Sequence, residues 1–245
     1  KIEAGSTKSY STTVEIPRSA LDREDAVAIK FEELNQRNPK DITLNIVTEA
    51  LPRPLFAYSY QILDAVKDSS KNNGDGLIQR GEDIEVLVSV KNIGEGAAEK
   101  NVISVRDLSN KEIFVKNGRA EIGTLNPGER KESILSFSIK ETVSLDKFSM
   151  DMIISDMVFG TLLTSKLTFP VVAGKPKIVQ TSGLLKVGKN YTPLYGGMSF
   201  DSPVLSMMRE GTVVMANAKN SDWFRITRPG KRCGWVWAKD VMELH

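Results

Sequence analysis

The sequence predicts an all-β protein, and two observations support this prediction. Apolar and polar residues alternate along most of the chain, for example in "DIEVLVSVKNI", "SILSFSIK" and "FSMDMIISD". Alternation with period two, interrupted by Asn, Gly, Pro and Asp, is typical of half-buried strands joined by turns. Only residues 19–27 have two interpretations. A short helical turn capped by Ser19 and a polar loop between strands both fit this segment.

Length and charge limit the classes of function. A chain of 245 residues suggests two or three domains, because single hydrophobic cores usually stop growing near this length. Its 33 basic and 31 acidic residues nearly balance, so the net charge predicts no nucleic-acid partner. No run of about 18 apolar residues occurs, and we expect no membrane span.

The scarcity of histidine and cysteine argues against catalysis in this chain. The only histidine is the last residue, His245, and the only cysteine is Cys233. A Ser-His-Asp or Cys-His site needs an imidazole held beside the nucleophile, and a cysteine zinc cluster needs several thiolates. We therefore expect a chain that is not an enzyme. An unlocated Ser-Lys pair is the alternative.

An internal repeat divides the first 173 residues. The segment "AGSTKSYSTTVEI" (residues 4–16) aligns without gaps with "PGERKESILSFSI" (residues 127–139). In the same register Val27, Ile29 and Phe31 align with Met150, Met152 and Ile154; after a two-residue insertion, Ile42, Leu44 and Ile46 align with Leu167, Phe169 and Val171. Residues 1–50 thus match the second half of residues 51–173. We expect the first copy to be the C-terminal half of a domain whose leading strands are not in this sequence.

The middle block carries motifs of a known family. "NNGDGLIQRGEDIEVLVSVKNIGEG" (residues 72–96) and "IGTLNPGERKESILSFSI" (residues 122–139) resemble the immunoglobulin-like CARDB repeats of bacterial surface and secreted proteins. The resemblance implies an immunoglobulin-like β-sandwich over residues 51–173. It also implies that residues 1–50 are part of a similar domain.

The stretch "KNNGDGLIQRGE" (residues 71–82) admits two interpretations. Asn73, Asp75 and Glu82 occupy positions 3, 5 and 12 of an EF-hand-type calcium loop, with Gly76 at the sharp bend. Lys71 stands where the first oxygen ligand belongs, and no helical pattern flanks the loop, so a plain Asp-Gly turn is favoured. Asp64 or Asp68 could still fold back as an extra ligand, which leaves Ca²⁺ as the only cofactor to consider.

Residues 174–245 form a separate module. The motifs around residues 201–204, 211–214, 223–226 and 230–236 keep the order and spacing of a bacterial SH3-like domain, which implies a small β-barrel. In "GWVWA", Trp235 and Trp237 face one side of a strand and Val236 the other. If Val236 is in the barrel core, the two tryptophans form a platform outside it or at the interface with the sandwich. In the opposite case they are core residues.

Relatives of SH3-like domains bind cell-wall peptides or protein termini in an aromatic groove. The resemblance implies that the groove residues here are Tyr191, Tyr195, Asp201, Trp223 and Trp237. The alternative for each of them is packing or contact between domains.

The order of the modules is similar to the region that follows the peptidase domain in some bacterial tail-specific proteases. No peptidase motif can be matched in this chain. We therefore expect a non-catalytic recognition and spacer tail of a bacterial periplasmic, envelope or secreted protein, with a peptide, a peptidoglycan-type ligand or an attached peptidase domain as partner. A calcium-rigidified adhesion or structural stalk is the alternative.

Overall fold

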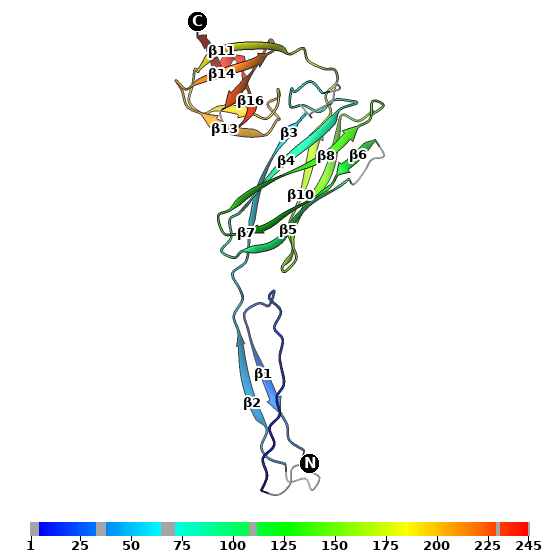
Figure 1. Ribbon diagram of the computed structural model, residues 1–245, viewed down its shortest axis with the longest axis vertical. Helices are drawn as coiled ribbons and strands as arrows, with labels where there is room; N and C mark the ends of the chain where they lie inside the picture. Colours follow the sequence, from blue (N-terminus) through cyan, green and yellow to red (C-terminus); the bar gives the residue numbers. More distant parts are fainter. Residues whose placement is uncertain (1–4, 33–37, 65–71, 108–111, 229–230, 245) are drawn as a thin grey trace. The chain divides into compact units, whose positions relative to one another are not determined.

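The computed structural model confirms the all-β class (Figure 1). It describes residues 5–32, 38–64, 72–107, 112–228 and 231–244. Over these ranges the only helical element is one 3-10 turn, Ala238–Asp240, and no helix is long and apolar enough to cross a bilayer. Strand β1 begins at Arg23, so the segment left open in the sequence forms a turn and a strand.

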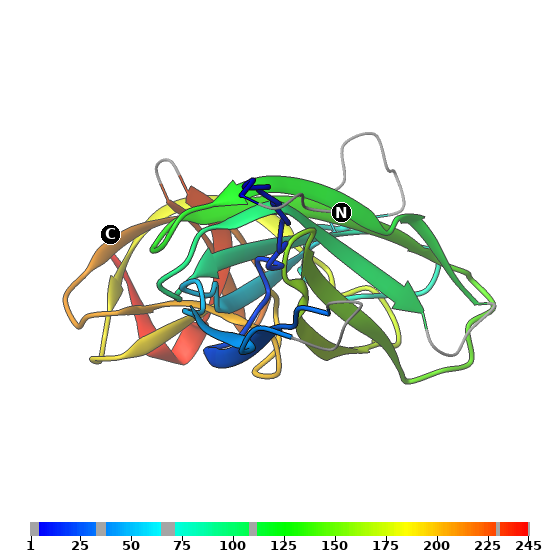
Figure 2. The same cartoon turned by 90° about the horizontal axis from the view of Figure 1, so that it is seen from below.

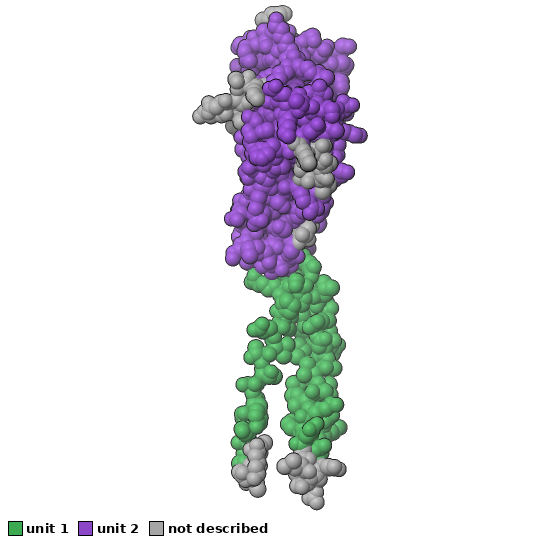
Figure 3. Space-filling view, turned by 90° about the vertical axis from the view of Figure 1, so that its right-hand side faces the viewer, with its two compact units in different colours: residues 1–53 green, residues 54–245 purple. Residues whose placement is uncertain are grey.

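The chain divides into two compact units, Lys1–Arg53 and Pro54–His245 (Figure 3). Among its described residues, 5–32 and 38–53, the first unit contains one antiparallel hairpin, formed by β1 (Arg23–Ile29) and β2 (Ile42–Thr48). The apolar side chains of Val27, Ile29, Ile42 and Leu44 are between 38 and 48 % exposed. Backbone pairing, rather than a core of its own, therefore holds this hairpin together.

The register of this hairpin refines the internal repeat. Val27 pairs with Leu44 in the first unit, and Met150 pairs with Leu167 in the second, so each pair is separated by 17 residues (44 − 27 and 167 − 150). With Val27 aligned with Met150, this register sets Leu44 beside Leu167, whereas the sequence alignment with its two-residue insertion sets it beside Phe169. A shift of two residues preserves strand alternation, which is why the sequence pattern could not separate the two alignments.

The second unit begins with a β-sandwich of two four-stranded antiparallel sheets (Figures 1 and 2). One sheet has the order β3-β4-β8-β6 and the other has the order β10-β9-β5-β7. Their bounds are β3 Phe56–Leu63, β4 Asp83–Asn92, β5 Ala98–Asp107, β6 Ile113–Asn117, β7 Arg119–Leu125, β8 Arg130–Ile139, β9 Lys147–Asp156 and β10 Gly160–Pro170.

Alternation explains how the two sheets pack. Along β9 every second residue is buried, and Met150, Met152 and Ile154 face the other sheet. Phe137 from β8 meets Phe148 from β9 edge to face, with ring centroids 5.5 Å apart. The inner faces of both sheets thus form one continuous apolar core.

The remaining strands form one seven-stranded antiparallel sheet in the order β13-β12-β16-β15-β14-β11-β17. Their bounds are β11 Val179–Val187, β12 Thr192–Tyr195, β13 Val204–Met208, β14 Val213–Lys219, β15 Trp223–Arg228, β16 Lys231–Trp237 and β17 Val241–Leu244. Side chains from β11 to β16 meet in a second, small core that includes Leu185, Leu194, Ile226 and Val236. The sheet is therefore curled around its own core, and we call this part the barrel.

Candidate functional site

Four aromatic rings gather on the barrel. Tyr195, Phe200, Trp223 and Trp237 form a chain of contacts with centroid separations of 5.8 Å (Tyr195–Phe200), 5.5 Å (Tyr195–Trp223), 5.1 Å (Phe200–Trp223) and 5.4 Å (Phe200–Trp237). Edge and tilted geometries of this kind are the ones that aromatic pairs prefer. We call these four residues the aromatic cluster.

Strand register explains why these rings meet. Trp223 at the start of β15 pairs with Trp237 at the end of β16, and Tyr195 at the end of β12 pairs with Trp235. Because Val236 is buried in the barrel core, its neighbours Trp235 and Trp237 face outward from that core. Of the two alternatives left by the sequence, the structure therefore has the platform outside the barrel core.

The cluster is only partly open to solvent. Trp223 is buried, Tyr195 and Trp237 are half-buried, and Phe200 is 59 % exposed. The Lys239 ammonium lies 5.0 Å from the centre of the Trp237 ring, within cation–π range. Phe200 is thus the exposed centre of the cluster, with a cation at its edge.

The structure brings together three of the five residues predicted for the groove: Tyr195, Trp223 and Trp237. Asp201 is exposed and follows Phe200 directly in the chain. Tyr191 is 82 % exposed in the turn before β12, and no ring contact joins it to the cluster among the described residues. Sequence reasoning missed Phe200. Its signal was an aromatic residue within the turn-rich stretch "GGMSFDSP".

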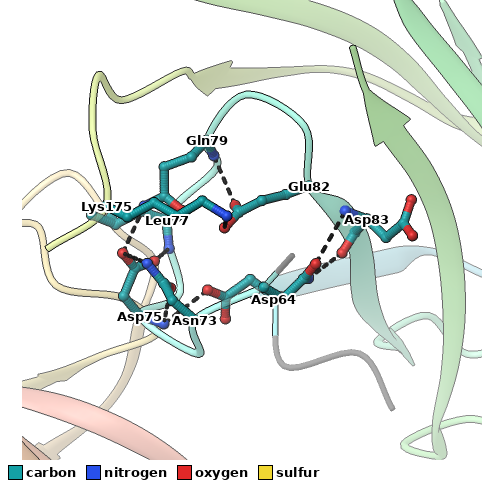
Figure 4. A network of polar contacts seen from close by, with 9 residues as sticks. Asp64, Asn73, Asp75, Leu77, Gln79, Glu82, Asp83 and Lys175 are labelled. Carbon is teal, nitrogen blue, oxygen red and sulfur yellow. Dashed lines mark hydrogen bonds and ion pairs between the residues drawn. The ribbon is translucent and has the colours of Figure 1, made fainter. Parts of the chain in front are cut away.

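The loop for which the sequence favoured a plain turn over a calcium site contacts both the sandwich and the barrel, and we call residues 72–82 the joint loop. Asp75 organises it: its Oδ1 accepts the Leu77 N–H at 2.7 Å, and its Oδ2 accepts the side-chain amides of Asn73 at 2.9 Å and Gln79 at 2.6 Å. Glu82 Oε2 accepts the Gln79 N–H at 2.9 Å. Figure 4 shows this network.

Asp64, which directly follows β3, enters the same network. Its Oδ2 accepts the Asp75 N–H at 2.8 Å, and Asp64, Asp75 and Glu82 are all buried. Burial and then the charge of Asp75 raise the pKa of Asp64 to about 7, against the lowering effect of the Gly76 and Asp75 N–H groups. Burial also raises the pKa of Glu82, which the nearby Lys175 partly opposes.

The joint loop connects sandwich and barrel through backbone contacts. The Asp75 carbonyl accepts the Met198 N–H at 3.0 Å, and Gly76, with φ of +75°, lies against the backbone of Gly196 and Gly197. A Cβ at Gly76 would collide with that backbone. The approach of two chain segments at this distance requires glycine.

An apolar cluster completes the joint. Leu77 from the joint loop packs with Met198, Ala218, Trp223 and Trp235 of the barrel. Trp223 therefore belongs both to this joint core and to the aromatic cluster.

Two further polar contacts join sandwich and barrel. Arg225 covers the Trp235 ring at 5.8 Å and reaches the Gly74 carbonyl at 3.5 Å, and Gln61 on β3 donates to the Cys233 carbonyl at 3.2 Å.

The residues predicted to bind a metal thus lie near one another but are also bonded to protein groups. Lys175 forms an ion pair with Glu82, with 3.4 Å between Nζ and Oε1. Within the described part of the chain, no three Asp, Glu, His or Cys side chains converge closely enough to hold an ion by themselves. Lys71 and Asp68, which also entered the sequence argument, lie outside the described residues.

No protein-family model matches the chain, and no curated protein matches it.

Proposed function

We propose that this chain is the non-catalytic recognition and spacer region of a bacterial envelope protein, in which the sandwich holds the barrel and the aromatic cluster binds a peptide or cell-wall peptide. The observation that carries the proposal is the exposed ring of Phe200 among Tyr195, Trp223 and Trp237. Aromatic residues with one buried and one open face dominate the energetics of recognition surfaces.

The charges beside the cluster favour a ligand with both an apolar part and charged groups. Lys239 lies over Trp237, and the exposed carboxylate of Asp201 follows Phe200 in the chain. Peptides of the peptidoglycan stem type carry amino and carboxylate groups on short aliphatic residues, so they suit this combination. Attachment to a tail-specific peptidase is part of the proposal and is supported by the resemblance of the modules.

The spacer role is supported by the joint. Main-chain hydrogen bonding, the close glycine approach and the shared apolar cluster all connect the sandwich with the barrel. A barrel held in this way presents its aromatic cluster in a constant orientation to the sandwich, as a spacer requires.

Titration with soluble stem peptides tests the proposal, with the tryptophan indole signals in nuclear magnetic resonance as the readout. We expect the indole signals of Trp223 and Trp237 to shift and Phe200→Ala to weaken binding at least about tenfold, because an exposed central ring is a typical hot spot. Phe114→Ala is the matched control, since Phe114 on β6 is similarly exposed at 63 % but belongs to the sandwich. Unchanged indole signals at millimolar peptide, or equal losses in both variants, would contradict the proposal.

A further inference from the structure

The carboxylate of Asp64, a residue outside the joint loop, lies within that loop. An EF-hand-type loop needs an oxygen at its first position, where this sequence has Lys71. The structure places the Asp64 carboxylate inside the loop, where it accepts the N–H groups of Asp75 at 2.8 Å and of Gly76. A carboxylate from the residue that follows β3 therefore supplies the charge that the loop sequence lacks.

One buried oxygen of this network has no hydrogen-bond donor among the described residues. Gln79 is only 2 % exposed, and its Oε1 is buried without a donor. The Nε2 atom of the same amide lies 2.6 Å from Asp75 Oδ2, so the Gln79 side chain reaches into the network (Figure 4). Glu82 Oε1 is also buried, and the Lys175 ammonium lies 3.4 Å from it. Buried polar atoms in native proteins almost always have a partner, and the Gln79 oxygen therefore indicates a further ligand.

The charges of the loop indicate that this ligand is positive. Asp64, Asp75 and Glu82 place three buried carboxylates around the loop, and Lys175 approaches the outer one, at 3.4 Å from Glu82 Oε1. Buried charges require opposite charges or metal ions near them. Even when Asp64 keeps its proton, one ammonium group does not balance the carboxylates of Asp75 and Glu82.

We propose that the joint loop binds Ca²⁺ through side-chain oxygens of Asp64, Asn73, Asp75, Gln79 and Glu82 and the main-chain carbonyl of Leu77. Calcium accepts six to eight carboxylate, amide and carbonyl oxygens in flexible geometry, whereas Mg²⁺ requires a smaller and more regular octahedron. Because no three acids of the described residues converge closely enough to hold an ion by themselves, binding must draw the amide and carbonyl oxygens inward. The site lies apart from Phe200, and its test is independent of peptide binding.

The place of this site gives it a structural effect. The loop that would hold the ion also carries the Asp75 carbonyl that binds Met198, the Gly76 contact and the Leu77 side chain of the joint core. An ion that orders the loop would therefore stabilise the attachment of the barrel to the sandwich.

Calorimetric titration of the full chain with CaCl₂, after treatment with EDTA, tests the site directly, and thermal unfolding supplies the second readout. At 100 times its dissociation constant, calcium should raise the melting temperature by about 5–10 °C, and Mg²⁺ at the same concentration should do much less. No binding heat together with an unchanged melting temperature would overturn the proposal.

Variants locate the ion. Asp64→Asn and Glu82→Gln each remove one charge at nearly constant shape and should weaken calcium at least about tenfold, because ligand charge sets affinity in such loops. Asp156→Asn is the matched control, since Asp156 is also a buried carboxylate that accepts backbone N–H groups, from Val158 and Phe159 at 2.7 Å. It should bind calcium like the unmodified chain. Unaltered calcium affinity in both Asp64→Asn and Glu82→Gln would refute the assignment.

Discussion

Replacing Gly76 by Ala tests whether the close glycine approach holds the barrel to the sandwich. Two costs add up at this position. The φ of +75° costs an L-residue about 1–2 kcal/mol, and the collision of Cβ with the Gly196–Gly197 backbone costs about 1–3 kcal/mol as overpacking. We therefore expect Gly76→Ala to lower the free energy of unfolding by about 2–5 kcal/mol.

Gly128→Ala separates these two costs. Gly128 has a φ of +79°, but a Cβ there would meet nothing within 4 Å. In this control, the free energy of unfolding should fall only by the cost of the positive φ, about 1–2 kcal/mol. The difference between the two variants measures the backbone contact at the joint.

Urea unfolding followed by tryptophan fluorescence is the suitable assay, because all three tryptophans are in the barrel and two of them, Trp223 and Trp235, lie in the joint core. If the joint opens, Gly76→Ala should also shift the native emission to the red and increase its quenching by iodide. Equal losses of stability in Gly76→Ala and Gly128→Ala, with unchanged native emission, would refute the reasoning.

Three further predictions concern stability. In denaturant unfolding, Leu167→Ala should lower the free energy of unfolding by about 2–5 kcal/mol and Leu44→Ala by less than about 1 kcal/mol. The reason is that Leu167 is 3 % exposed and Leu44 is 48 % exposed, and equal losses would contradict it. Asn92→Ala should cost about 2–4 kcal/mol, because its buried amide bonds the Gly96 and Leu125 carbonyls. The Asp64 carboxyl faces Asp75, and Lys175 approaches Glu82 nearby. Its pKa is about 7 in the folded protein and 3.8 in the unfolded chain. Its contribution to the free energy of unfolding is therefore fully present below pH 3.8 and is lost as the pH rises through 7. In EDTA, stability should therefore fall by about 2–3 kcal/mol from pH 5 to pH 8.5, and a fall of the same size in Asp64→Asn would contradict this cause.

The fold class could be predicted from the sequence because strand alternation is a local property. In β9 the residues at every second position are the ones that the other sheet buries, so the sequence "FSMDMIISD" by itself predicts a half-buried strand. Alternation cannot detect shifts by two residues. The sequence alignment sets Leu44 beside Phe169, whereas the pairing register sets it beside Leu167 when Val27 is aligned with Met150, and the two alignments differ by such a shift.

The joint could not be predicted because its partners are far apart in the chain. The sequence offered the return of Asp64 or Asp68 to the loop only as an alternative, and Gly76 meets Gly196 and Gly197 only in the folded protein. Glycine in "GDG" and "YGGM" indicates turns, but nothing local shows that the two turns touch. In the aromatic cluster, Trp223 and Trp237 were among the groove residues that the SH3-like resemblance implied, whereas Phe200 lies in a loop whose path no periodicity describes.

A single short segment of the barrel connects the joint loop with the aromatic cluster. Gly196 and Gly197 lie against Gly76, and Met198 donates its N–H to the Asp75 carbonyl. Phe200, two residues beyond Met198, is the exposed ring of the cluster.

The conformation of the Asp75 turn therefore fixes the position of Met198, from which the backbone continues to Phe200. Trp223 strengthens the connection, since it packs in the joint core and also contacts Phe200. Because coupling between binding sites is reciprocal, an ion that orders the joint loop and a peptide that orders Phe200 should each raise the affinity for the other.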